Sequence, residues 1–254
     1  MVFTDSQLDL FSSCYQSFSI DSISQAPEAS GIYAWYATLD AGRMDWELDV
    51  VDGVDAGIER LRKLLRKQTN RYNSLELNTI AKGAFSQTWG GSLTDKTSDV
   101  LLKVLGDNLI SKSHDSHDEK KAPKLQDTLE SRDARKLMVS ALQGAIPIFS
   151  SPIYIGVAEC LRRRLLSHAN DITKISMEIS RDPDARDGLK KYRNKSFATR
   201  VISTGFNPSH LKVFTFDFDE LNRNIEINSV DTRTVAESVE WLLNRWYHPY
   251  LGKR

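Results

Sequence analysis

Residues 31–38 have the sequence GIYAWYAT, a glycine followed mainly by aromatic and β-branched side chains. Turn-forming residues bound this stretch on both sides, with Pro27 before it and Gly42 after it. This composition predicts a β-strand. A second such stretch, residues 146–157 (IPIFSSPIYIGV), predicts another strand, whose two prolines confine its pairing to a sheet edge or to the start of the strand.

Helical periodicity is clearest in residues 54–68. Ile58, Leu61 and Leu65 recur at helical spacing, with basic residues between them, which predicts an amphipathic helix with a basic face. The same kinds of pattern predict further helices over residues 75–85, 98–109, 131–143 and 232–247, a helix directly after the second strand, and a third strand over residues 211–218. Residues 111–124 are polar and aperiodic, and are therefore expected to form a mobile loop.

The composition is that of an ordinary globular chain. The 254 residues are 40% hydrophobic and 27% charged, which argues against wholesale disorder and against a fibrous repeat. The 34 basic and 34 acidic side chains cancel, so the simplest sign of a nucleic-acid partner, a strongly cationic chain, is missing. Basic side chains nevertheless cluster locally, in residues 60–71, 162–164 and 190–200.

Several kinds of site and location are disfavoured. Cys14 and Cys160 are too few for a disulfide framework or a four-cysteine zinc site. No apolar stretch approaches a membrane span and the first twenty residues have no basic region, so we expect a cytoplasmic protein without a membrane segment. The sequence contains no GxxxxGK[ST], GxGxxG, GxSxG or HExxH motif, so we expect no nucleotide cofactor. His114 and His117 have metal-ligand spacing, but no third ligand accompanies them in the polar loop, where a solvated role is favoured.

The tripeptides Gly31-Ile32-Tyr33 and Tyr154-Ile155-Gly156 lie in the two predicted strands. The chain thereby resembles the GIY-YIG nuclease superfamily. In that family an arginine stands eight residues after the second glycine and a histidine often stands four residues further on, and Arg164 and His168 occupy these positions. A third strand and a helix carrying a metal-binding glutamate come next, and Glu237 and Glu240 lie in the last predicted helix, before Pro249.

The chain departs from the family pattern in two places. Residues 34–153 separate the two tripeptides, where the family normally has a short connection, so a helical insertion must leave and return between adjacent antiparallel strands. Hairpin tips tolerate such insertions well. Gly252 stands where the family has an asparagine near the end of the domain, so no asparagine is assigned a role.

The resemblance implies a mixed α/β (α+β) fold, with a small, mostly antiparallel sheet flanked by helices. Residues 1–39 and 150–254 would form the nuclease domain, and residues 40–149 an inserted, mainly helical domain for DNA recognition or for oligomerisation as a homodimer. The implied activity is that of a divalent-metal-dependent DNA endonuclease using Mg²⁺ or Mn²⁺. A restriction or phage-defence role is the favoured setting, and repair and mobile-element roles are the alternatives.

The implied catalytic residues are Tyr33, Tyr154, Arg164, His168, Glu240 and Glu237. Phosphodiester hydrolysis needs an activated water, a cation facing the developing negative charge and help for the leaving oxygen. Tyr33, and less directly Tyr154, would take the proton of the water, provided that positive charge lowers the pKa of the phenol. Arg164 would supply that charge and grip a phosphate, and His168 would move a proton.

One of two glutamates would hold the metal, with Glu240 preferred over Glu237 for its distance to Pro249. Leu161, Leu165, Leu166 and Ala169 form the apolar stripe of their predicted helix, so Arg164 and His168 are expected to share a different face. We also expect Tyr33, Tyr154, Arg164 and one glutamate to converge on one concave face. DNA contacts are expected from basic residues in three segments, namely Arg60, Lys63, Lys67, Arg162, Arg163, Lys191 and Arg193.

Two other functions are compatible with the sequence. The zero net charge and Gly252 also suit a nucleic-acid-binding or interaction protein on a GIY-YIG scaffold that has lost its activity. An acid-base enzyme acting on a small substrate through Tyr33 and His168 is the third, but no cofactor motif supports it. Dependence of cleavage on a divalent metal separates the nuclease from the binding protein.

Overall fold

The chain divides into two compact units. The computed structural model describes residues 12–73, 77–82, 88–93, 122–182, 196–225 and 230–252. Residues 1–38 and 143–254 make up one unit, here called the sheet unit, and residues 39–142 make up the other, the inserted unit. The inserted unit therefore ends at residue 142, whereas the sequence predicted that it would end at residue 149.

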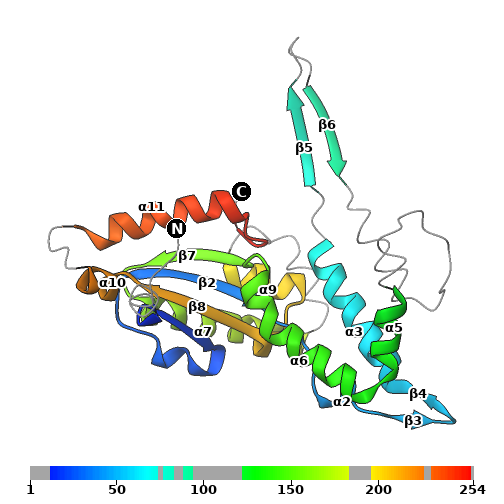
Figure 1. The fold of residues 1–254 in the computed structure, drawn as a ribbon. Helices are drawn as coiled ribbons and strands as arrows, with labels where there is room; N and C mark the ends of the chain where they lie inside the picture. Colours follow the sequence, from blue (N-terminus) through cyan, green and yellow to red (C-terminus); the bar gives the residue numbers. More distant parts are fainter. Residues whose placement is uncertain are drawn as a thin grey trace. The chain divides into compact units, whose positions relative to one another are not determined.

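A four-stranded sheet forms the centre of the sheet unit (Figure 1). Its strands are β1 (Tyr15–Ser19), β2 (Gly31–Ala37), β7 (Tyr154–Ala158) and β8 (Leu211–Asp217), in the order β1-β8-β2-β7. Every pairing in this sheet is antiparallel. The predicted fold class, a small antiparallel sheet flanked by helices, is confirmed. Strand β1 was not predicted.

Strand β2 defines the two faces of the sheet. Gly31, Tyr33, Trp35 and Ala37 are buried, and the three residues between them are half-buried. Successive side chains of a strand point to opposite faces, so these two sets line different sides of the sheet. On the neighbouring strand β7, the residues opposite Tyr33 and Trp35 share their face.

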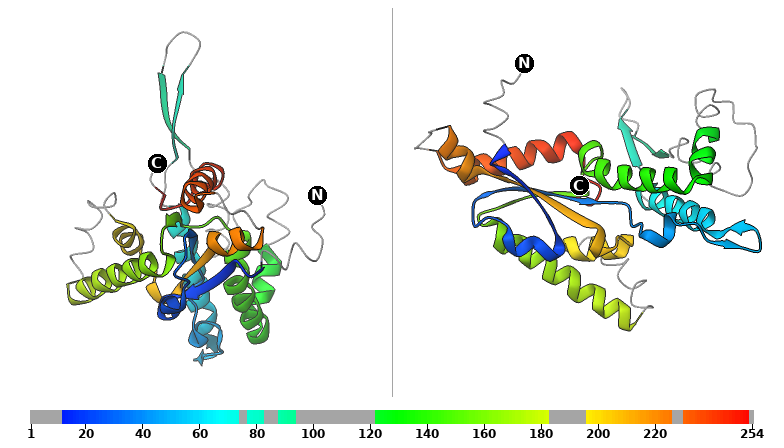
Figure 2. Two further views of the ribbon diagram at one scale, coloured as in Figure 1. Left: turned by 90° about the vertical axis from the view of Figure 1, so that its left-hand side faces the viewer. Right: turned by 60° about the horizontal axis from the view of Figure 1, so that its bottom comes forward.

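Helices cover both sides of the sheet (Figures 1 and 2). α7 (Leu161–Arg181) and α9 (Phe197–Thr204) lie on the side of Tyr33 and Trp35, here called the α7 face. α11 (Thr232–Tyr247) lies across the opposite side, the α11 face, and contacts β2 and β7. Shorter elements complete the unit, namely the 3-10 helices η1 (Ile20–Gln25) and η2 (Pro208–His210) and the helix α10 (Phe218–Asn224).

The inserted unit combines helices with two hairpins. Its helices are α2 (Arg43–Trp46), α3 (Ala56–Asn73), α5 (Ala122–Glu130) and α6 (Arg132–Phe149), the last of which continues into the sheet unit. Its hairpins are β3 (Val50–Val51) with β4 (Val54–Asp55), and β5 (Leu77–Lys82) with β6 (Thr88–Leu93). The positive φ angles of Asp52 and Gly53 suit the tight turn between β3 and β4.

Most of the predicted elements are present with shifted ends. The strands predicted over 31–38 and 211–218 are β2 and β8, and the helices predicted over 54–68, 131–143 and 232–247 are α3, α6 and α11. The helix predicted after the second strand is α7. The helix predicted over residues 98–109 lies outside the described residues.

Three predictions of secondary structure were wrong. The helix expected over residues 75–85 is replaced by strand β5, because pairing with β6 outweighs the weak helical pattern of this stretch. The strand expected over residues 146–157 begins only at Tyr154, since α6 runs on to Phe149 with Pro147 inside it. The loop expected over residues 111–124 gives way to α5 at Ala122, and its earlier residues, including both histidines, lie outside the described ranges.

In the described ranges of the chain, no helix is both long and apolar enough to cross a membrane. Cys14 and Cys160 are not joined by a disulfide bond.

Candidate active site

The two motif glycines make room for close contacts. A Cβ atom on Gly156 would lie 2.5 Å from Tyr33 Oη and 2.6 Å from its Cζ, because the Tyr33 ring crosses the backbone of β7 at this point. A Cβ on Gly31 would collide with the carbonyl oxygen of Phe216 in β8 and would lie 2.9 Å from Leu161 Cδ1 in α7. One glycine therefore lets Tyr33 reach the sheet edge, and the other lets the helix and a neighbouring strand approach β2.

Three of the predicted residues meet at the Tyr33 hydroxyl. Tyr33 Oη lies 2.9 Å from His168 Nε2, and Arg164 Nε donates a hydrogen bond to the same oxygen at 3.3 Å. Tyr33 is 1% exposed and His168 is 6% exposed, so the contact is buried. The one proton of the Tyr33 hydroxyl can be donated to His168 when Nε2 is the unprotonated nitrogen of the ring. Strand β2 and helix α7 thus supply a chain of hydrogen bonds from Arg164 through Tyr33 to His168.

The protonation states of this chain follow from its burial. Burial, and after it the neighbouring Tyr154, raise the pKa of Tyr33 well above that of a free phenol, although the bond from Arg164 opposes the shift. Burial, and after it the charges of Arg164 and Arg200, lower the pKa of His168 to about 4. At neutral pH Tyr33 is therefore protonated and His168 is neutral. Arg164 lowers the pKa of Tyr33, as expected, but desolvation outweighs the cation and the net shift of the pKa is upward.

Tyr154 lies beside this group but not directly opposite Tyr33. The register pairs Tyr33 with Gly156 and Trp35 with Tyr154, so the two tyrosines are diagonal neighbours on the α7 face. Their ring centroids are 6.1 Å apart, and the Tyr154 and His168 centroids are also 6.1 Å apart. The expected side-by-side arrangement of Tyr33 and Tyr154 on paired antiparallel strands is confirmed in this offset form.

His168 lies on the apolar stripe of its helix. The residues of α7 that are buried are Leu161, Leu165, His168, Ala169 and Ile172. Leu166 is 37% exposed, so the stripe runs through His168 and not through that leucine. The expectation that His168 shares a separate face with Arg164 was therefore wrong. The polar ring is accepted there because Tyr33 supplies a hydrogen-bond partner inside the core.

A second arginine joins the cluster from α9. The Arg200 guanidinium carbon lies 5.5 Å from the centroid of the Tyr154 ring, a cation–π arrangement. Phe197, at the start of α9, packs on Tyr154 with a centroid distance of 4.8 Å and on His168 at 5.1 Å. Arg200 is 7% exposed. No sequence motif points to Arg200, because only the fold brings α9 next to Tyr154 of β7.

The two predicted glutamates lie on α11 and not with the tyrosines. Glu237 is exposed, and Arg233 Nε donates to its Oε1 at 2.9 Å. Glu240 is half-buried, and Asn244 Nδ2 donates to its Oε1 at 2.6 Å. α11 covers the face of the sheet opposite to α7 (Figure 2). The structure therefore brings together Tyr33, Tyr154, Arg164 and His168 on one face and places both glutamates on the helix across the sheet.

Burial distinguishes the two glutamates. Desolvation, with a smaller contribution from Glu237, raises the pKa of Glu240 despite the hydrogen bond from Asn244. A divalent cation would relieve this penalty by favouring the ionised carboxylate. The described residues contain no group of three His, Cys, Asp or Glu side chains that could enclose a metal. Glu240 is thus the glutamate whose ionised form a nearby cation would favour more, whereas Glu237 is already paired with Arg233.

The basic residues predicted to contact DNA differ in their pairing. Arg162 Nη1 is 2.6 Å from Glu28, and Arg163 Nη2 is 3.5 Å from Glu159, so both charges are compensated. Lys191 and Arg193 lie outside the described residues.

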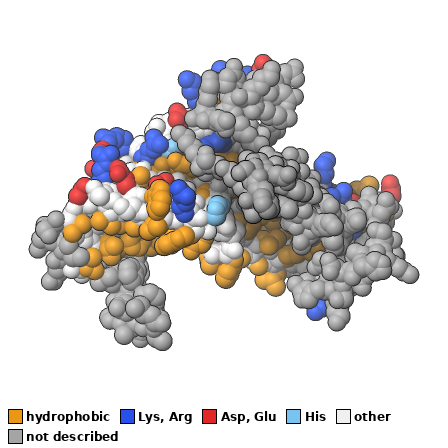
Figure 3. Space-filling view, turned by 90° about the horizontal axis from the view of Figure 1, so that it is seen from above, with side chains coloured by type: hydrophobic (Ala, Val, Ile, Leu, Met, Phe, Trp, Pro, Cys, Tyr) orange, Lys and Arg blue, Asp and Glu red, His pale blue; other side chains and the backbone are white. Residues whose placement is uncertain are grey.

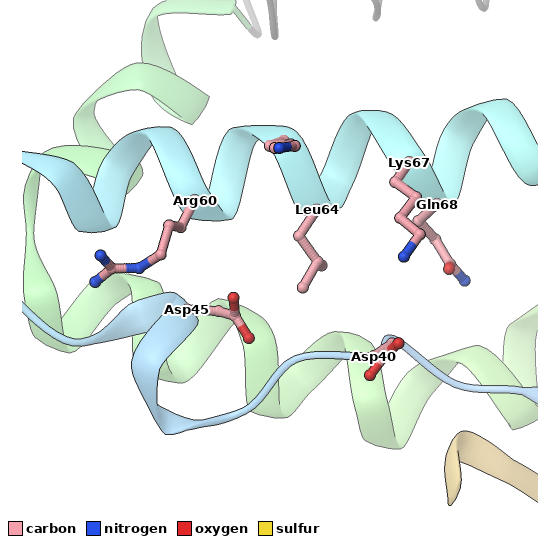
Figure 4. Close-up of a pocket in the computed structure, with 7 residues that line it drawn as sticks. Asp40, Asp45, Arg60, Leu64, Lys67 and Gln68 are labelled. Atoms are coloured by element: carbon pink, nitrogen blue, oxygen red, sulfur yellow. The ribbon is translucent and has the colours of Figure 1, made fainter. Parts of the chain in front are cut away.

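The basic side of α3 borders a cavity of about 300 Å³ in the inserted unit. Figure 4 shows Arg60, Leu64 and Lys67 of α3 facing Asp40 and Asp45, and Lys63 and Gln68 complete the lining. Arg60 Nη1 pairs with Asp49 Oδ2 at 2.5 Å, and its Nε donates to the carbonyl of Met44. Lys63 and Lys67 are exposed. The structure thus groups the three predicted cations, with Arg60 compensated by an acid.

Figure 3 views the molecule from the side on which α11 covers the sheet. Hydrophobic side chains gather on this surface. Among the exposed apolar residues of α11, Trp241 is 56%, Trp246 66% and Tyr247 54% exposed. Arg245 lies over the Trp241 ring at 4.9 Å. The C-terminal half of α11 thus presents three exposed aromatic side chains, one of them next to the half-buried Glu240 in sequence.

No known family model, curated protein or solved structure shows significant similarity to this chain.

Proposed function

We propose that the protein is a divalent-metal-dependent endonuclease that hydrolyses phosphodiester bonds of DNA in the cytoplasm, in a restriction or phage-defence role. The observation that carries the proposal is the hydrogen-bonded chain from Arg164 through Tyr33 to His168, built across the glycine of the second tripeptide. The order of the elements, from β2 and β7 through α7 and β8 to α11, also matches the GIY-YIG pattern. A cation, a phenol and a neutral imidazole in contact are the parts that phosphodiester hydrolysis requires.

Substrate binding is assigned to Arg164. Its guanidinium has no carboxylate partner among the described residues, so its positive charge is available to an anion. Arginine binds phosphate in a planar, two-pronged geometry and stays charged through the reaction. A phosphate held there would lie next to the Tyr33 hydroxyl.

Activation of the water is assigned to Tyr33 and His168 together. A phenol with a raised pKa is a poor base alone, but Tyr33 can take a proton from the water while passing its own to His168 Nε2. Negative charge bound beside Arg164 and Arg200 would offset the two cations that lower the pKa of His168. The substrate would therefore make His168 a better proton acceptor at the moment of reaction.

The metal is assigned to Glu240. Glu240 lies across the sheet from Arg164 and Tyr33, so a divalent cation held there would act on a substrate that extends around the edge strand β7, which α11 contacts. The test of the whole proposal is incubation of the pure protein with plasmid DNA, with Mg²⁺ or with EDTA. The expected result is cleavage with Mg²⁺ and none with EDTA. Arg164→Gln should abolish cleavage and weaken DNA binding without abolishing it, because other cations, such as Lys63 and Lys67, would still contact the DNA. DNA binding without cleavage under either condition would instead assign the protein to the class of binding modules.

The two glutamates provide the first prediction. Glu240→Gln is expected to lower Mg²⁺-dependent cleavage at least tenfold, because it removes the half-buried carboxylate that a divalent cation would bind. Glu237→Gln is the matched control on the same helix, and it should retain activity because Glu237 is exposed and paired with Arg233. Cleavage rates as a function of Mg²⁺ concentration make the measurement. Full activity of Glu240→Gln would exclude this residue as the metal ligand.

The inserted unit provides the second prediction, which concerns DNA binding. Changing Arg60, Lys63 and Lys67 together to Gln should weaken binding and lower the slope of log K against log salt by about two, since each phosphate contact contributes about one and Arg60 is already paired with Asp49. Arg60→Gln alone should change the slope little. Titration of a labelled duplex at several salt concentrations measures both. An unchanged slope in the triple variant would assign this surface to a protein partner or a second copy of the chain.

A further inference from the structure

Arg200 is the most unusual buried charge in the sheet unit. It is 7% exposed, and its Nε atom is fully buried without a hydrogen-bond partner. No carboxylate among the described residues forms an ion pair with it, whereas Arg162, Arg163 and Arg223 each have one. An isolated buried cation is costly, so a side chain kept in this state calls for an explanation.

The position of Arg200 within α9 adds to this cost. α9 begins at Phe197, with Ser196 as its N-cap, so Arg200 lies in the first turn or just beyond it. The N-terminal end of a helix carries partial positive charge and favours anions over cations. Neither the helix nor a carboxylate compensates Arg200. The Tyr154 ring at 5.5 Å is the favourable contact that the described residues give it.

Arg200 and Arg164 act on the same group. Arg164 bonds to Tyr33 and Arg200 lies over the Tyr154 ring, and the centroids of these two rings are 5.7 and 6.1 Å from that of His168. Both cations accordingly lower the pKa of His168. Arg164 comes from α7 and Arg200 from α9, and the two helices pack against each other. Two guanidiniums without carboxylate partners thus flank a cluster of two tyrosines and a histidine.

We propose that Arg200 is a second phosphate ligand of the site and that, with Arg164, it binds the phosphodiester backbone of a nucleic-acid strand lying against Tyr154. This inference rests on the proposed nuclease function and adds the residue that, with Arg164, makes the site a clamp for a polyanion. Nε is the only fully buried unsatisfied nitrogen of Arg200, so the two Nη nitrogens are the ones left to meet the phosphate. Two arginines from two helices can hold a strand at two points, which fixes its direction across the tyrosines.

The experiment measures DNA affinity without cleavage and thermal stability together. A labelled DNA duplex is titrated in EDTA against the wild type, Arg200→Gln and the control Arg223→Gln, whose side chain is exposed and paired with Glu220. Arg200→Gln is expected to bind about tenfold more weakly, with a salt slope lower by about one, and to melt at or above the wild-type temperature, because an uncompensated buried charge has been removed. Arg223→Gln should match the wild type in all three measurements.

Inorganic phosphate provides the second arm. It should raise the melting temperature of the wild type and raise that of Arg200→Gln less, as expected for a ligand that binds only the folded state. A response to phosphate but not to DNA would assign the site to a small phosphate-bearing molecule and overturn the nucleic-acid ligand.

The proposal is also overturned if Arg200→Gln binds DNA as the wild type does, or if the variant melts well below it, which would indicate a structural role. These results are independent of cleavage. If Arg200→Gln loses DNA binding but the wild type shows no Mg²⁺-dependent cleavage, the proposed nuclease function is contradicted and the role of Arg200 in DNA binding is supported. If the wild type cleaves DNA but Arg200→Gln binds it normally, the nuclease function is supported and the role of Arg200 is contradicted.

Discussion

Tyr33→Phe is expected to reduce DNA cleavage by about 10²–10⁴-fold, the usual contribution of a group that transfers a proton in the rate-limiting step. The variant removes one oxygen, and with it both bonds that connect Arg164 and His168. The phenylalanine ring still fills the space over Gly156, so the packing between β2 and β7 should persist. Cleavage rates in Mg²⁺ and DNA affinity in EDTA are measured side by side.

Tyr36→Phe is the matched control for this prediction. Tyr36 lies in the same strand, but the alternation of β2 places it half-buried on the opposite face of the sheet. Its hydroxyl should be irrelevant to cleavage. Tyr33→Phe will also lose stability, by about 1–3 kcal/mol, because His168 Nε2 is left buried without its partner. A Tyr33→Phe variant that cleaves as fast as the Tyr36→Phe variant would remove Tyr33 from the mechanism.

The part of the site that the sequence predicts is the part encoded by strands and a single helix. Gly31 and Gly156 mark two stretches of strand composition, and these stretches do pair, with Tyr33 beside Tyr154. The fixed spacing from Gly156 to Arg164 and His168 carries both onto α7, within reach of Tyr33. The resemblance to the GIY-YIG pattern identified this group before the structure, and short spacings within and between adjacent elements leave its members little freedom to separate.

The remaining features depend on how distant elements pack. Periodicity placed His168 on a polar face, because a histidine counts as polar until a buried partner such as Tyr33 is known. Arg200 lies far from Tyr154 in sequence and joins it only because α9 packs against α7. The glutamates of α11 were grouped with the tyrosines through the GIY-YIG resemblance, that is, from the order of the elements and the distance to Pro249. Chain order does not determine which face of a sheet a later helix covers, and α11 covers the other one.

The chain treats its buried arginines in two ways. Arg135, in α6 of the inserted unit, is fully buried, and its Nη2 donates to Asp55 Oδ2 at 2.7 Å. Burial opposes the ionised form of Asp55, but hydrogen bonds from the Asp49 and Gly57 amides and from Arg135 outweigh it and lower the pKa of the carboxyl. Arg200 has no such partner among the described residues. A paired buried cation belongs to the fold, and the unpaired one is the candidate for ligand binding.

Asp55→Asn is accordingly expected to destabilise the inserted unit by about 3–5 kcal/mol, the usual cost of breaking a buried ion pair by removing one partner. Asparagine keeps the size of the side chain and an oxygen that can accept from the Asp49 and Gly57 amides, so the loss isolates the charge facing Arg135. Hydrogen exchange of peptides from α3 and α6 measures the stability of this unit locally. Exchange at the wild-type rate would show that the pair contributes nothing.

The double variant Asp55→Asn with Arg135→Met separates two contributions to the loss of stability: the loss of the ion pair itself and the cost of burying an unpaired Arg135. Methionine fills the buried volume without a charge, so the double variant should recover more than half of the stability lost in Asp55→Asn. Arg200→Gln corresponds to the second step alone, because Arg200 already has the unpaired state that Asp55→Asn creates for Arg135. Two results together would separate the roles of the two arginines. Replacing Arg135 should restore stability to Asp55→Asn, as expected for a structural residue. Replacing Arg200 should cost no stability and weaken DNA binding, as expected for a ligand-binding residue.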